Sequence, residues 1–87
     1  MHQLTKTKHM LNCNIKVNRY YRHYKSGIYK VLMIGKCTET NQTLIVYSKF
    51  NDINVWIRPL SIFDEEVLPG IRRFSLIGDD EYVNSEL

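Results

Sequence analysis

Short apolar segments alternate with turn signals along most of this chain, and this pattern constrains its fold more than any other feature. The turn signals are Ser26-Gly27, the polar runs 38–42 and 51–54, and Pro69-Gly70. The segments between them are rich in β-branched and aromatic residues, which favour strands. The pattern therefore predicts an all-β domain in which successive strands pair antiparallel.

The predicted strands cover residues 19–25, 28–37, 43–50, 55–58 and 71–77. Strict alternation in segment 28–37 assigns Lys30, Leu32, Ile34 and Lys36 to one face and Tyr29, Val31, Met33, Gly35 and Cys37 to the other. Pro59 ends the fourth segment because it cannot donate a ladder hydrogen bond. Behind it, Leu60 to Asp64 is predicted to form one helical or 3₁₀ turn, with Phe63 in the core.

About five short strands with one helical or 3₁₀ turn before the last strand is the plan of a small SH3-like antiparallel barrel. An OB-like barrel is the alternative. The predicted organisation is a basic, flexible arm at residues 1–18, the barrel domain at 19–77 and an acidic tail at 78–87.

The 87 residues leave room for one domain, and a chain of this size buries roughly 60% of its unfolded surface. No apolar run reaches the length of a membrane span and no secretory signal is recognisable, so we expect a cytoplasmic protein. Cys13 and Cys37 are expected to be free thiols. A zinc site built from these cysteines with His23 and His9 lacks closely paired ligands, so the sequence predicts neither a metal nor a cofactor.

Charge is distributed unevenly along the chain. Residues 1–38 contain no Asp or Glu, and the carboxylate side chains begin at Glu39, although the net charge is only +3. A basic surface that attracts phosphates would produce this pattern. Pairing of strands from the basic and acidic halves would produce it as well.

An ordered series of landmarks between Tyr20 and Phe74 resembles the bacterial family known as domain of unknown function 1653. The landmarks are Tyr24-Lys25, Gly27, Tyr29, Glu39-Thr40, Val46-Tyr47, Trp56, Arg58-Pro59-Leu60, Phe63, Glu66-Val67, Gly70 and Arg73-Phe74. The resemblance implies an SH3-type small barrel and brings no activity, substrate or cofactor. Where that family often reads Ala-Arg-His-Ser, this chain has Gly35-Lys36-Cys37-Thr38, so no histidine role at that turn is carried over.

Trp56 and Arg58 stand two residues apart on a predicted strand, so they project from the same face. Together with Tyr21 and His23 they form our candidate ligand-binding surface. Aromatic rings and basic side chains of this kind suit a non-enzymatic binding module for nucleic acid or another anionic ligand. Two structural alternatives stay open: Trp56 in the core, and Arg58 in an ion pair with Glu39 or with a carboxylate of 64–66.

Two other functional classes are compatible with the sequence. A protein or peptide interaction domain would use an exposed strand edge or the Trp56 face, and it includes weak homo-oligomerisation. A small enzyme would need His23, Glu39, Tyr47 and Arg58 to meet in one acid/base group. Because no reaction-specific motif is present, we predict no catalytic residues.

Overall fold

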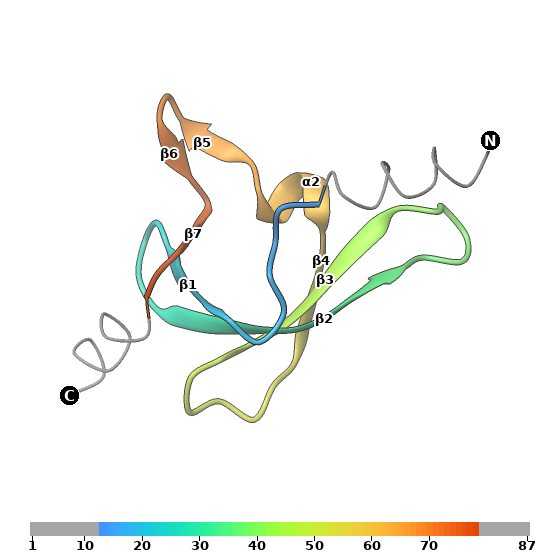
Figure 1. Ribbon diagram of the computed structural model, residues 1–87, viewed down its shortest axis with the longest axis horizontal. Helices are drawn as coiled ribbons and strands as arrows, with labels where there is room; N and C mark the ends of the chain where they lie inside the picture. Colours follow the sequence, from blue (N-terminus) through green and yellow to red (C-terminus); the bar gives the residue numbers. More distant parts are fainter. Residues whose placement is uncertain (1–12, 79–87) are drawn as a thin grey trace.

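The computed structural model describes residues 13–78 of the chain. The elements are β1 (Tyr20–His23), β2 (Ile28–Lys36), β3 (Thr43–Lys49), β4 (Trp56–Pro59), α2 (Leu60–Phe63), β5 (Glu66–Leu68), β6 (Ile71–Arg72) and β7 (Phe74–Leu76). Five strands form an antiparallel sheet in the order β4-β3-β2-β1-β7, and β5 pairs with β6 (Figure 1). The predicted all-β fold is confirmed. The sheet is not closed, because β4 and β7 remain as its two edges.

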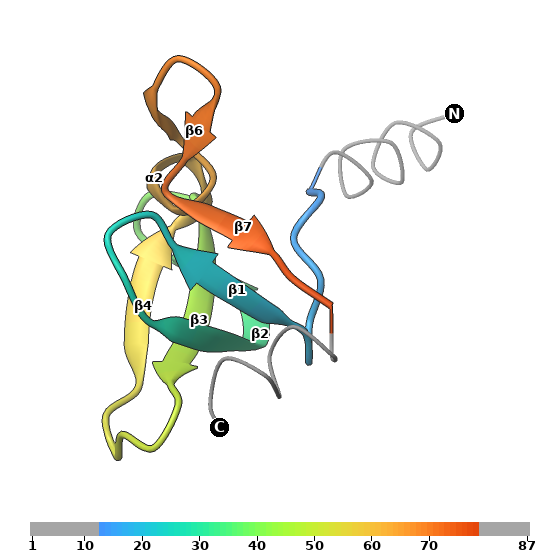
Figure 2. The same ribbon diagram turned by 90° about the vertical axis from the view of Figure 1, so that its left-hand side faces the viewer.

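The large sheet is strongly curled. Figure 2 shows β1 and β7 crossing the direction of β3 and β4, with α2 at one end of the sheet and the β5–β6 hairpin projecting beyond it. The curl encloses a core to which the N-terminal segment, β1, β2, β3, α2 and β7 all contribute. Among residues 13–78, no helix is long and apolar enough to span a membrane.

Aromatic rings make up the centre of this core. Phe63 and Phe74 stack with ring centroids 4.1 Å apart and an interplanar angle of 4°. Tyr21 and Tyr47 pack edge-on against Phe63, at 5.6 and 5.3 Å. The predicted helical turn is confirmed as α2, and Phe63 lies fully buried on it, as expected.

Residues 13–18 pack against the sheet, although the sequence assigned them to a flexible arm. Ile15 is buried, the Lys16 backbone N–H donates to the Tyr21 hydroxyl at 2.8 Å, and the Asn18 N–H donates to the Val31 carbonyl at 2.8 Å. The folded domain therefore begins before residue 19. The rest of the predicted arm and all but Gly78 of the predicted acidic tail lie outside the described residues.

A β-bulge interrupts the alternation of β2. The register shifts between Val31 and Met33, so that Leu32 is the extra residue. Val31 and Ile34 then both face the core, whereas Met33 is 59% exposed. The face assignment predicted by strict alternation is therefore wrong beyond Val31, because a bulge reverses every side chain that follows it.

The segment 71–77, predicted as one strand, forms two. Arg73 breaks it, since its N–H donates to the Glu65 carbonyl at 2.8 Å and its carbonyl accepts from the Tyr24 N–H at 2.9 Å. The fourth predicted strand differs at its end, because Pro59 belongs to β4 and lies opposite Leu44. A proline is tolerated there because β4 is an edge strand.

Candidate functional site

A pocket of about 370 Å³ opens on the inner face of the curled sheet. It is lined by His23, Tyr29, Tyr47, Lys49, Asp52, Trp56, Arg58 and Phe74, and we call it the aromatic pocket. This volume is at the lower end of the roughly 300–1,000 Å³ range of small-molecule sites. The pocket is thus suited to a single planar group rather than to a large ligand.

Cross-strand pairing places these side chains together. His23 lies opposite Phe74, Tyr29 opposite Lys49 and Tyr47 opposite Trp56. Residues directly opposite in an antiparallel pair share a face, with Cβ atoms about 5 Å apart. Five strands therefore bring distant segments of the chain to one concave surface.

The floor of the pocket consists of Tyr29, Tyr47 and Phe74. Tyr29 meets Phe74 at 5.4 Å and 89°, and Tyr47 meets Phe74 at 5.4 Å and 69°. Such edge-to-face contacts are favoured by the quadrupoles of the rings. The floor is rigid because Tyr47 and Phe74 are also members of the buried core.

The Tyr47 hydroxyl is the polar group of this floor. Burial raises its pKa above 10.0, while the charges of Arg58 and Arg73 act in the opposite direction. The hydroxyl makes no hydrogen bond to any residue of 13–78. Every buried side-chain oxygen in that part of the chain has a hydrogen-bond partner, so the Tyr47 hydroxyl oxygen is not among the buried ones. The hydroxyl therefore reaches the solvent in the pocket, where it can donate to a ligand or accept from one.

Trp56 and Arg58 form the rim on β4. The indole is 49% exposed and Arg58 is half-buried, so the alternative of a core tryptophan is wrong. The alternative of an ion pair for Arg58 is wrong as well. The ion pairs of Asp64 and Glu65 in the described region are with Arg72 at 3.2 Å and Arg73 at 3.3 Å, and Arg58 has no carboxylate partner among residues 13–78.

His23 stands at the side of the pocket, with its ring 4.9 Å from that of Phe74. The Lys25 backbone N–H donates to His23 Nδ1 at 3.2 Å, which assigns the proton of the neutral ring to Nε2. Burial lowers the pKa of His23 below 6.5, and the positive charges of Arg58, Arg73 and Lys25 lower it further. His23 is thus a neutral donor surrounded by cations.

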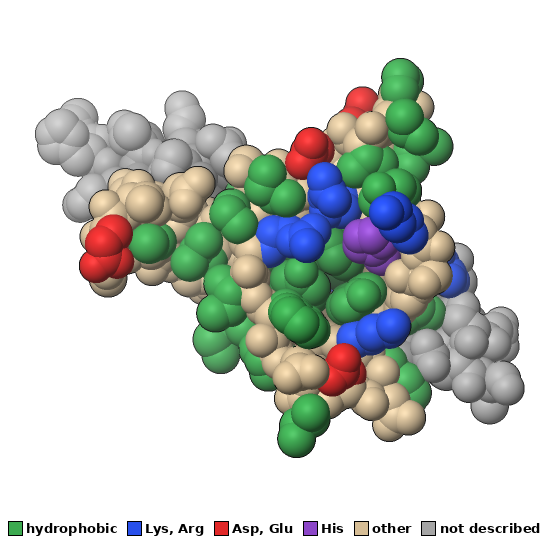
Figure 3. Space-filling view, turned by 180° about the vertical axis from the view of Figure 1, so that it is seen from behind, with side chains coloured by type: hydrophobic (Ala, Val, Ile, Leu, Met, Phe, Trp, Pro, Cys, Tyr) green, Lys and Arg blue, Asp and Glu red, His purple; other side chains and the backbone are tan. Residues whose placement is uncertain are grey.

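The positive charge of this face is visible from outside. In Figure 3, blue basic side chains border the purple histidine, and green hydrophobic surface lies between them. The charges of Arg58, Arg73 and Lys25 lower the pKa of His23, and Lys49 lines the pocket itself. One carboxylate, that of Asp52, joins the lining. A planar anion would meet both rings and cations here.

Tyr21 is placed elsewhere. It shares the inner face with Tyr29 across the β1–β2 pair, but it is only 3% exposed. Burial raises its pKa, although the hydrogen bond from the Lys16 backbone opposes this effect. Tyr21 thus supports the core, whereas His23, Trp56 and Arg58 line the pocket.

The acid/base group considered for an enzyme is not assembled. Glu39 lies in the turn that follows β2, where its Oε1 accepts from the Thr38 hydroxyl at 3.1 Å. The pocket is at the other end of the β2–β3 pair, roughly 20 Å away along the strand at 3.3 Å per residue. Glu39 therefore cannot act with His23 and Arg58. Within residues 13–78, no three His, Cys, Asp or Glu side chains are grouped to hold a metal.

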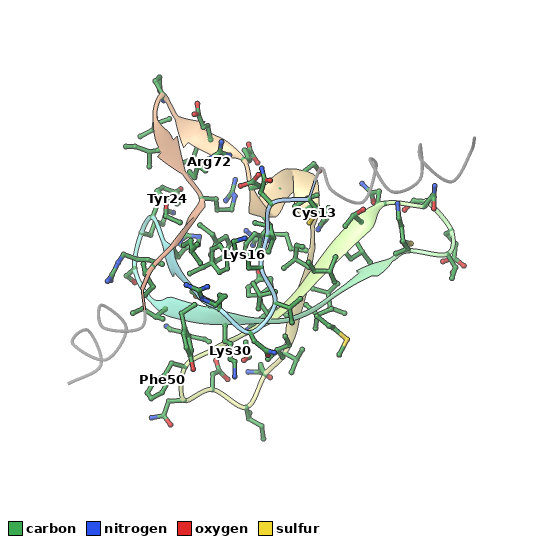
Figure 4. All side chains as sticks on the ribbon, in the orientation of Figure 1. Cys13, Lys16, Tyr24, Lys30, Phe50 and Arg72 are labelled. Atoms are coloured by element: carbon green, nitrogen blue, oxygen red, sulfur yellow. The ribbon has the colours of Figure 1, made fainter. Side chains whose placement is uncertain are left out.

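A second pocket, of about 440 Å³, lies on the outer side of the same region. Its lining includes Tyr20, Lys30, Ser48 and Phe50, and it shares Lys49 and Asp52 with the aromatic pocket. Figure 4 shows Lys30 and Phe50 near each other where β2 approaches the β3–β4 turn. Basic and aromatic side chains thus occur on both sides of this turn.

Sequence reasoning did not select Tyr29, Lys49, Asp52 or Phe74 as site residues. The spacing of Tyr47 and Lys49 on one strand is a usable signal, because residues two apart share a face. The contributions of Asp52 and Phe74 depend on the turn geometry and on the β1–β7 pairing. Neither is encoded locally.

The comparisons with known proteins agree with this architecture. Residues 19–75 match the family described as Protein of unknown function (DUF1653). The chain is also similar to the crystal structure of a DUF1653 protein from Bordetella bronchiseptica, with a TM-score of 0.64, 28% sequence identity, and coverage of 75% of this chain and 90% of that one. No curated protein matches the chain. The family match covers every lining residue of the aromatic pocket and all of the large sheet except Leu76, and the chain belongs to the DUF1653 family.

Proposed function

We propose that this domain is a non-enzymatic binding module that holds one nucleotide unit of single-stranded nucleic acid in the aromatic pocket. The observation that carries the proposal is the placement, beside a floor of rings, of an exposed Trp56 and of Arg58, which has no carboxylate partner within residues 13–78. Of our four predicted contacts, His23, Trp56 and Arg58 belong to this site, and Tyr21 is replaced by Tyr29, Tyr47 and Phe74.

The aromatic surfaces supply the stacking component. A base stacked on Trp56 would cover an indole that is now 49% exposed. Stacking of this type contributes about 1–3 kcal/mol per base, and every base has the required flat face. Sequence-tolerant affinity for unpaired bases is the expected result.

The basic groups supply the phosphate component. Arg58 and Lys49 line the pocket. The charges of Lys25 and Arg73 reach His23 at the side of the pocket, where they lower its pKa. A guanidinium binds phosphate through two parallel hydrogen bonds, and Arg58 has its charge available because no carboxylate among residues 13–78 pairs with it. Affinity should therefore fall with added salt.

The second candidate function is protein–protein interaction, and a different surface favours it. Met33 and Ile57 flank Val46 on the outer face of the sheet, and they are 59% and 63% exposed. β4 is also an edge strand, which leaves one side of its backbone open for pairing. Apparent mass measured by light scattering at two protein concentrations tests this candidate separately.

The primary test is a fluorescence anisotropy titration of labelled single-stranded oligonucleotides at about 50 mM and about 300 mM salt. We expect binding at low salt that weakens at high salt. Trp56→Ala should weaken it about 5- to 150-fold, the equivalent of a lost base stack. Arg58→Ala should weaken binding and also reduce its salt dependence.

Arg72→Ala is the matched control for Arg58→Ala. It removes the same charge from the β5–β6 hairpin, where Arg72 pairs with Asp64 outside the pocket, and it should leave affinity nearly unchanged. Circular dichroism establishes that each variant is folded. Absence of binding at low salt, or equal affinities for wild type and a folded Trp56→Ala variant, would refute the proposal.

A further inference from the structure

A pocket that only attracted anions would not be expected to contain a carboxylate such as that of Asp52. Asp52 lines the aromatic pocket together with Lys49 and Arg58. Its orientation is fixed by the turn, because Oδ1 accepts from the Asn54 backbone N–H at 2.9 Å and from the Asn54 side-chain amide at 3.0 Å. The second carboxylate oxygen has no hydrogen bond to the rest of the described chain.

The oppositely charged side chains that line this pocket do not form ion pairs with one another. The ion pairs formed within residues 13–78 join Arg72 to Asp64 and Arg73 to Glu65, and Asp52 has no such pair with Lys49 or Arg58. A carboxylate repels a phosphate placed near it. It is useful only if the ligand also presents a hydrogen-bond donor, because an ionised carboxylate accepts and cannot donate.

We propose that Asp52 selects the base, accepting a hydrogen bond from the 4-amino group of cytosine and disfavouring thymine and uracil. This inference rests on the proposed function. Asp and Glu are suited to accept from cytosine N4. Thymine and uracil carry a carbonyl oxygen at the same position, and that oxygen and the Asp52 carboxylate are both acceptors.

The division of labour in the pocket follows from this assignment. Trp56 and the ring floor bind the flat face of a base, Arg58 and Lys49 bind its phosphate, and Asp52 reads its edge. Only the last contact distinguishes pyrimidines of the same size. Cytosine and thymine therefore form the sharpest comparison.

The experiment compares oligo(dC) and oligo(dT) pentamers at pH 7.5 and low salt with the full chain. We expect wild type to bind oligo(dC) about 5- to 150-fold more tightly, as expected for one good base-edge contact. Asp52→Asn should abolish or reverse this preference, because with Oδ1 held by Asn54 the amide presents Nδ2 to the ligand, and Nδ2 can donate to thymine O4 but cannot accept from cytosine N4. This variant keeps an Oδ1 acceptor for Asn54. Glu66→Gln, which removes an exposed carboxylate outside the pocket lining, is the charge control.

A ligand-side variant makes the test independent of protein folding. Pentamers of pyrimidin-2-one nucleotides lack both the 4-amino group of cytosine and the 4-carbonyl oxygen of thymine, so wild type should bind them more weakly than oligo(dC) and more tightly than oligo(dT). Equal affinity for oligo(dC) and oligo(dT) that still depends on Trp56 would overturn the inference and leave the proposed function intact. Failure of both pentamers to bind would overturn both.

Discussion

Tyr47 and Trp56 lie directly opposite each other on β3 and β4, yet they differ sharply in exposure. Tyr47 is 5% exposed and belongs to the core, whereas Trp56 is 49% exposed at the rim of the pocket. One cross-strand pair thus joins the interior of the domain to its candidate binding surface.

Substitution of these two residues should have different effects on stability. Tyr47→Ala removes a ring packed against Phe63 and Phe74, and we expect the free energy of unfolding to fall by about 3–5 kcal/mol. Trp56→Ala should lower it by about 1 kcal/mol or less, because much of the indole is already in water. Urea unfolding followed by circular dichroism measures both. Loss of the cooperative unfolding transition in Trp56→Ala would contradict this expectation and show that the indole is part of the core.

The fluorescence of Trp56 should report its exposure directly, since the chain contains one tryptophan. We expect clear quenching by acrylamide, with a Stern–Volmer constant between that of a buried indole and that of the urea-unfolded chain, because the residue is 49% exposed. Saturation with an oligonucleotide should protect the indole and reduce the constant. The β5–β6 variant Arg72→Ala serves as the control and should behave as wild type. A strongly protected indole in the free protein would contradict the exposed rim.

The titration of His23 should reduce stability in mild acid. Its pKa lies below 6.5 in the folded protein because of burial and the charges of Arg58, Arg73 and Lys25, so the unfolded chain binds the proton more tightly. The contribution of neutral His23 is therefore complete above pH 6.5 and is lost as the pH falls from 6.5 towards the folded-state pKa.

Two measurements check this expectation. Urea unfolding between about pH 5 and pH 8 should show a decline in wild type that is smaller in His23→Asn, a variant that can still accept from the Lys25 N–H. NMR titration should place the His23 pKa below 6.5 and move it upward in Arg58→Gln. A wild-type pKa above 6.5 would reverse the predicted direction.

Gly27 combines two constraints that substitution can separate. Its φ is +95°, and a Cβ there would lie 3.2 Å from Lys49 Cε and 3.2 Å from Tyr29 Cε1, both in the pocket wall. Gly70 has φ +79°, but a Cβ at that residue would meet no atom within 4 Å, and Gly35 has neither constraint.

We expect Gly70→Ala to cost about 1–2 kcal/mol from backbone strain alone, and Gly27→Ala to cost more because the pocket wall must also shift. Gly35→Ala should be neutral or slightly stabilising. Unfolding free energies of the three variants give the order. Equal losses at Gly27 and Gly70 would show that crowding adds nothing.

Much of the sheet could be predicted because its signals are local. Turn residues mark the ends of the strands, and Pro59 followed by apolar residues at helical spacing predicts α2 with Phe63 inward. The bulge at Leu32 has no comparable sequence signal, because residues 31–34 are all apolar and any of them could face the core. The exposure of Trp56 could not be decided from the sequence because it depends on how far the sheet curls over β4.

The candidate site was predicted in part for the same reason. Alternation placed Trp56 and Arg58 on one face, and this prediction is reliable because both residues belong to the same strand. Tyr21 and His23 also share a face, but the core covers the first and leaves the second at the pocket. That difference arises from Phe63 on α2, which packs against Tyr21, and from the segment before β1, where the Lys16 N–H donates to the Tyr21 hydroxyl. Neither contact is marked in the local sequence of β1.

Tyr47 and Phe74 serve as pocket floor and as core, so binding and folding are thermodynamically linked in this domain. Any molecule that covers the floor binds only the folded chain, and at one hundred times its Kd it should add about 2.7 kcal/mol to the free energy of unfolding. The melting temperature is then a reporter of pocket occupancy, and it requires neither a label nor a prior assumption about the class of ligand.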